Sequence, residues 1–130
     1  MKWILFFLFS VIAARAQLAV TVSPPHIVGQ KALVKLLMKN NLADKIESAR
    51  AVCFLLDGKG KVVGQSTKWV IGQNKISLGS GANSTFNFVI TPQQPFTNTN
   101  LTAKVNFTRV VLESGKVVNL KTDVQIQNTQ

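Results

Sequence analysis

Few residues in this chain could support catalysis or metal binding, and they lie far apart. The 130 residues include one His (His26), one Cys (Cys53) and only 5 Asp or Glu. His26 follows two prolines and Cys53 lies in an apolar stretch, so the sequence places no oriented base beside the thiol. Zinc and calcium sites need several Cys, His or acidic ligands at fixed spacing, and no segment supplies them. We therefore expect no enzymatic activity, no metal and no cofactor.

The acidic residues fit turns better than acid–base pairs. Asp44 and Glu47 are close in sequence but share their segment with Lys45 and Arg50, which favours a solvated connection. The segment 57–60 reads Asp-Gly-Lys-Gly, which is typical of a hairpin turn whose Asp accepts bonds from nearby N–H groups.

Positive charge is the strongest global signal, with a formal net charge of +10 at pH 7. Lys31, Lys35 and Lys39 share the outward face of one expected strand, which makes them the candidate anion-binding residues. Lysines far outnumber arginines, and the Phe residues alternate toward the core, so nucleic acid is not the expected partner. We expect another envelope protein or an anionic envelope polymer. The alternative is that the charge only keeps the domain soluble.

The first 16 residues have the form of a cleavable signal peptide. Lys2 precedes an apolar run from Trp3 to Ala14, and Ala14-Arg15-Ala16 offers short side chains where signal peptidase requires them. Cleavage after Ala16 would leave residues 17–130 as a secreted, periplasmic or extracellular domain. A retained membrane anchor is the alternative. No later apolar run is long enough to span a bilayer.

The positions of the strands follow from alternation with period two, interrupted by Gly, Pro and Asn clusters. A helix over 31–40 is the one alternative, because its lysines are spaced by four, but the neighbouring segments all alternate. The expected strands are Leu18–Val22, Lys31–Lys39, Ile46–Leu56, Lys61–Gly64 with a further stretch through Trp69–Ile71, Phe86–Ile90, Leu101–Thr108 and Val118–Ile126.

About seven short strands predict an all-β fold, a single immunoglobulin-like antiparallel sandwich over residues 17–130. The lone Cys cannot close a disulfide within the chain, so burial of apolar side chains must hold the sheets together. The predicted inward residues are Val34, Leu36, Val52, Phe54, Phe86, Phe88, Val105, Phe107, Leu120 and Val124.

Two of these strands are apolar on both faces, which normally means that both faces are covered. Leu33 and Leu37 lie opposite one core row, and Cys53 and Leu55 lie opposite another. With Trp69 on an adjoining strand, these residues form a candidate interaction surface. A charged residue at position 55 should then leave folding intact and weaken association.

Several segments resemble the bacterial extracellular modules of the FxLYD type. The segments are Val34–Asn41, Ile46–Asp57, Gly58–Gly64 and Leu78–Phe86, in which Lys-Asn-Asn ends one strand and Asp-x-x-Gly-Lys-Val-Val joins the next two. Only Leu55 and Asp57 fit the motif that names the family. The resemblance implies an immunoglobulin-like envelope module and carries over no active residue.

The expected function is therefore that of an exported, non-enzymatic β-sandwich with a binding or structural role at the cell envelope. The alternative is a periplasmic chaperone or assembly factor that acts through an edge strand. Asn83, Asn100 and Asn106 begin Asn-x-Ser/Thr sequences, which would be glycosylated only in a eukaryotic secretory pathway.

Overall fold

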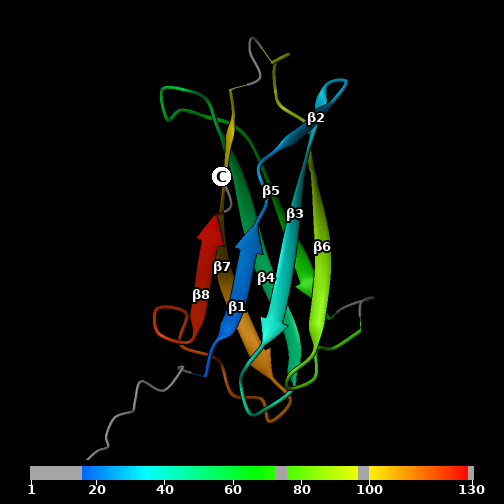
Figure 1. Ribbon diagram of the computed structural model, residues 1–130, viewed down its shortest axis with the longest axis vertical. Coiled ribbons are helices and arrows are strands. Elements are labelled where there is room, and N and C mark those ends of the chain that lie inside the picture. The colour runs from blue at the N-terminus through cyan, green and yellow to red at the C-terminus, as the bar shows by residue number, and fades with distance from the viewer. Residues whose placement is uncertain (1–15, 73–75, 97–99, 129–130) are drawn as a thin grey trace, which may run out of the picture.

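Eight β-strands form two sheets in the computed structural model, which describes residues 16–72, 76–96 and 100–128 (Figure 1). Within these ranges there is no helix that is long and apolar enough to cross a membrane. Residues 1–15 of the expected signal peptide lie outside the described part of the chain. The strands are β1 (Leu18–Val22), β2 (His26–Val28), β3 (Lys31–Asn40), β4 (Ile46–Leu56), β5 (Val62–Ile71), β6 (Asn83–Ile90), β7 (Thr102–Leu112) and β8 (Val124–Asn128).

The two sheets pack face to face as a β-sandwich, which confirms the expected all-β fold class. One sheet contains β8, β1, β3 and β6, with β2 continuing the line of β1 beside β3; the other has the order β5-β4-β7. In Figure 1 the first sheet lies in front of the second. The grouping is similar to that of immunoglobulin-like sandwiches, except that the last strand, β8, pairs with β1 and not with β7. The pairing is antiparallel except between β1 and β8, which run parallel.

Strands β1 and β2 are separate because proline has no N–H to donate to a neighbouring strand. Pro24 and Pro25 separate β1 from β2. Ser23 keeps the break attached to β3: its N–H donates to the carbonyl oxygen of Lys35 at 3.0 Å, and its Oγ accepts from the N–H of Lys35 at 3.0 Å. Strand β3 itself is regular from end to end, so the helix alternative for this segment is wrong.

Most of the predicted core residues are inside the sandwich. The fully buried ones are Val34, Leu36, Phe88, Val105 and Phe107. Three more are partly buried and pack against the core, namely Phe86, Leu120 and Val124. Strands β3, β6 and β7 therefore present the faces that alternation predicted.

Strand β4 presents the opposite face from the one expected. Ala51, Cys53 and Leu55 are fully buried, whereas Val52 and Phe54 are only half-buried and lie on the outer side of the sheet. Arg50 belongs to the same alternating row as Val52 and Phe54. A guanidinium has no partner inside an apolar core, so its row must face solvent and the row of smaller side chains must turn inward.

The last predicted strand is shorter than expected because a turn interrupts it. The side-chain oxygen of Asn119 accepts a hydrogen bond from the N–H of Lys121 at 3.0 Å. The main-chain carbonyl oxygen of Asn119 accepts another from the N–H of Asp123 at 2.8 Å. Val118 reaches the core before this turn, and β8 begins only after it, at Val124.

Candidate functional site

The outer side of the front sheet carries a row of lysines and leucines along β3, which we call the lysine face: Lys31, Leu33, Lys35, Leu37 and Lys39. The three lysines are exposed, and Leu37 is 47% exposed. Because a strand rises about 3.3 Å per residue, lysines four residues apart are about 13 Å apart along the strand. The expected sharing of one face by these lysines and leucines is confirmed.

Side chains without a carboxylate flank the lysine face on both sides. On β6, Asn87 pairs with Lys35 and Asn83 with Lys39. On the other side, Ala19 of β1 pairs with Lys39. His26 of β2 pairs with Leu33. None of the strands β1, β2, β3, β6 and β8 contains an Asp or Glu. The positive charge of the row is therefore not neutralised by a carboxylate within its own sheet.

The predicted interaction surface does not exist as one surface. Leu33 and Leu37 belong to the lysine face, but Cys53 and Leu55 are 0% exposed inside the sandwich. Trp69 lies on the outer side of the other sheet, where β5 pairs with β4. Its ring lies 6.0 Å from the guanidinium carbon of Arg50, a cation–π distance. Placing Cys53 and Leu55 on an outer face was wrong because β4 is turned over.

Burial also determines the chemistry of Cys53. Desolvation raises the pKa of its thiol from 9.0 to about 12, since the apolar core disfavours a thiolate. The neutral thiol is a poor nucleophile and metal ligand. Cys53 therefore acts as a core residue, in agreement with its position among Ala51, Leu55 and the other buried side chains.

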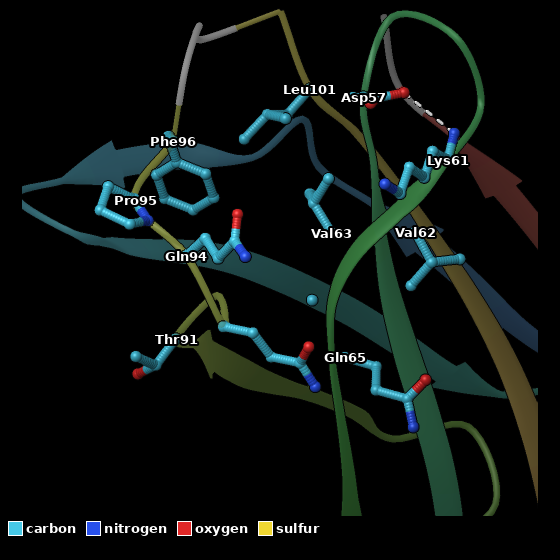
Figure 2. Close-up of a pocket in the computed structure, with 12 residues that line it drawn as sticks. Asp57, Lys61, Val62, Val63, Gln65, Thr91, Gln94, Pro95, Phe96 and Leu101 are labelled. Atoms are coloured by element: carbon cyan, nitrogen blue, oxygen red, sulfur yellow. Dashed lines mark hydrogen bonds between the residues drawn. The ribbon is translucent and has the colours of Figure 1, made fainter.

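A cleft of about 600 Å³ opens at one end of the sandwich (Figure 2). It lies between β5 and the connection from β6 to β7, near the hairpin that joins β4 to β5. Figure 2 shows the side chains of Phe96, Val63 and Leu101 gathered around its upper part, with the Gln94 amide below them. The lining residues are Asp57, Lys61, Val62, Val63, Gly64, Gln65, Thr91, Gln93, Gln94, Pro95, Phe96 and Leu101.

The charged end of the cleft is held in place by the hairpin turn. The Asp57 carboxylate accepts hydrogen bonds from the N–H groups of Lys59 and Lys61, each at 2.9 Å. These bonds hold the pKa of Asp57 below its usual value, because they favour the charged form. Gly60 completes the turn at φ 81°, a conformation that glycine adopts without strain. The expected hairpin turn is confirmed, and its carboxylate is engaged in the turn.

Sequence reasoning missed this cleft. Residues 91–100 lie between two predicted strands, and Phe96 packs against the core from this connection. The sequence feature that could have indicated the cleft is Phe96, a large aromatic residue in an otherwise polar connection. The other wall, at Val62–Gln65, lies about 30 residues earlier, and only the fold brings the two together.

Among the described residues there is no group of three or more His, Cys, Asp or Glu side chains that could hold a metal ion.

Comparison with known proteins adds little to this geometry. No protein-family model and no curated protein matches this chain. A solved structure titled as a β-glucuronidase from glycoside hydrolase family 2 is similar at 23% sequence identity, with a TM-score of 0.41. The match covers 77% of this chain and 10% of that one, and at this TM-score it carries no argument about function.

Proposed function

We propose that this protein is an exported, non-enzymatic binding module of the cell envelope, whose lysine face binds an anionic envelope polymer. The observation behind the proposal is the row Lys31, Lys35 and Lys39 on a sheet whose strands contain no carboxylate. Repeated cations about 13 Å apart along one line suit a linear polyanion. The aliphatic stems of the lysines and the side chains of Leu33 and Leu37 would cover the less polar parts of the polymer.

The lysine face is tested by removing its charge. In the variant Lys31→Gln/Lys35→Gln/Lys39→Gln, binding to purified poly(glycerol phosphate) should fall about 100-fold at low salt, since each lysine contributes about 1 kcal/mol near an anionic surface. Binding would be measured by calorimetry at two salt concentrations. Salt should weaken binding of the unaltered protein more than that of the variant.

A matched variant separates a binding face from a general effect of charge. The variant Lys59→Gln/Lys116→Gln/Lys121→Gln also removes three positive charges, but from exposed turns. We expect this variant to lose no more than about threefold, because its lysines lie in separate turns and not in the row along β3. Equal losses in the two variants would contradict the proposal and would mean that the charge acts only through the net value of +10.

Export is the part of the proposal that rests on residues 1–16. In a host with a secretion pathway, the intact mass of exported protein should correspond to a chain that begins at Gln17. Ala16→Phe should block this cleavage because signal peptidase accepts only short side chains there, whereas Arg15→Phe changes the tolerant position between the two alanines. Unaltered protein that kept Met1 in the membrane fraction would instead be anchored, contrary to the proposal.

The FxLYD resemblance supports the same role, since it implies an immunoglobulin-like module outside the cell. A chaperone or assembly factor that acts through an edge strand is the second candidate. The observation that favours it is the cleft beside β5, an edge strand of its sheet within the described residues.

A further inference from the structure

The cleft described above follows the edge of β5. Four consecutive residues of this strand line it, from Val62 to Gln65. These residues follow one another along the strand, so the cleft runs beside β5 over this stretch. A segment bound in the cleft would therefore lie alongside β5.

This edge is open to pairing. Within the described ranges β5 pairs with β4 on one side and with no strand on the other. Every second residue of an edge strand directs its N–H and C=O groups outward, where an added strand can bond to them. The register between β4 and β5 skips Val63, because Leu55 pairs with Gly64 and Leu56 with Val62. This bulge lies in the wall of the cleft, a common position for bulges beside binding sites.

The opposite wall determines what kind of segment fits. Phe96, Pro95 and Leu101 supply apolar surface facing Val63, and the remaining side chains on this wall, such as Gln94, are uncharged. The two charged lining residues, Asp57 and Lys61, are opposite in sign. In a chain of net charge +10, the cleft is thus a locally neutral site. A neutral cleft favours an uncharged ligand, in contrast to the polyanion proposed for the lysine face.

We propose that the cleft binds an extended, uncharged peptide segment of a partner protein as an added strand on β5, with one aliphatic side chain seated among Val63, Phe96 and Leu101. A volume of about 600 Å³ lies within the range of about 300–1,000 Å³ usual for binding pockets. Main-chain bonds along the edge provide affinity in this mode, and the side-chain pocket provides selectivity. This inference assigns a site and a ligand class to the second candidate function above, and it does not depend on the polymer binding proposed for the lysine face.

The experiment begins with a displayed library of random short peptides selected against the full chain. Selected peptides should alternate aliphatic and uncharged polar residues. In a synthetic copy of the best peptide, N-methylation of every second amide should weaken binding at least about tenfold in one register and less than about threefold in the other, because only alternate amides face β5. This readout leaves the protein unaltered, so folding defects cannot imitate it.

Hydrogen exchange then locates the peptide on the protein. Binding should protect alternate amides within Val62–Lys68, and Phe96→Ala should weaken binding at least about tenfold. The variant Lys31→Gln/Lys35→Gln/Lys39→Gln should bind the peptide unchanged, which separates this inference from the proposed function. Failure to select any peptide, equal effects of the two methylation registers, or protection elsewhere would overturn the inference. Binding of a neutral oligosaccharide in place of a peptide, lost in Phe96→Ala, would overturn it as well.

Discussion

Leu55→Glu should leave the protein unfolded, whereas the same substitution at the neighbouring residue, Phe54→Glu, should be tolerated. Leu55 is 0% exposed within the core, so a carboxylate there would be buried without a partner. The expected loss is about 5 kcal/mol or more, comparable with the total stability of a small domain. Phe54 is half-buried on the outer side of β4 and pairs with Lys104, which would offset a negative charge.

The pair of variants tests which face of β4 is inside. Urea unfolding followed by far-ultraviolet circular dichroism would give the free energy of unfolding of each. We expect Phe54→Glu to lose about 1–2 kcal/mol, chiefly from reduced apolar contact. A folded Leu55→Glu variant together with an unfolded Phe54→Glu variant would mean that β4 is turned the other way.

The same strand shows where sequence reasoning succeeds and where it fails. The bounds of β4, Ile46–Leu56, match the prediction because Asp44 and Lys45 precede the apolar stretch and Asp57 and Gly58 follow it. Its predicted orientation was wrong because both alternating rows are apolar between Ala51 and Leu56, so alternation alone does not determine which row is buried. Arg50 was the informative residue, since one charged side chain is costlier to bury than two apolar ones are to expose.

Strand β3 posed the easier problem. Its outward row contains three lysines, so alternation assigns the other row, which includes the predicted core residues Val34 and Leu36, to the core. Ala32 and Met38 of that row are buried as well. The lysine face was therefore predictable residue by residue. The cleft was not, because its walls come from separate segments whose meeting depends on how the two sheets pack.

Asn40→Asp should destabilise the protein strongly, although the two side chains have nearly the same shape. Asn40 is the one buried polar or charged residue of the described core, at 0% exposure. Its Nδ2 donates to the carbonyl oxygens of Asp44 at 2.9 Å and Leu78 at 3.0 Å, and its Oδ1 accepts from the N–H of Leu42 at 2.9 Å. This amide thus joins the end of β3 to two connections.

An aspartate cannot make these bonds at neutral pH. One of its oxygens would face two carbonyl oxygens, so both donated bonds are lost and a buried negative charge meets two negative dipoles. We expect a loss of about 3–5 kcal/mol at pH 7. Leu78 also exchanges two main-chain bonds with Ile46, at 2.8 and 2.9 Å, so loosening this point should release the first residue of β4 as well.

The pH dependence identifies the cause. Burial and the facing carbonyls raise the pKa of the introduced carboxyl in the folded state above its unfolded value of about 3.9. Stability tied to such a group is present below the unfolded pKa and is lost as the pH rises through the folded pKa. Relative to the unaltered protein at each pH, Asn40→Asp should therefore recover part of its loss when the pH is lowered from 7 to about 4. Asn41→Asp, at the exposed neighbouring position, is the control and should change stability by less than about 0.5 kcal/mol. A deficit in Asn40→Asp that stayed the same at both pH values would show that lost packing, and not the buried charge, is responsible.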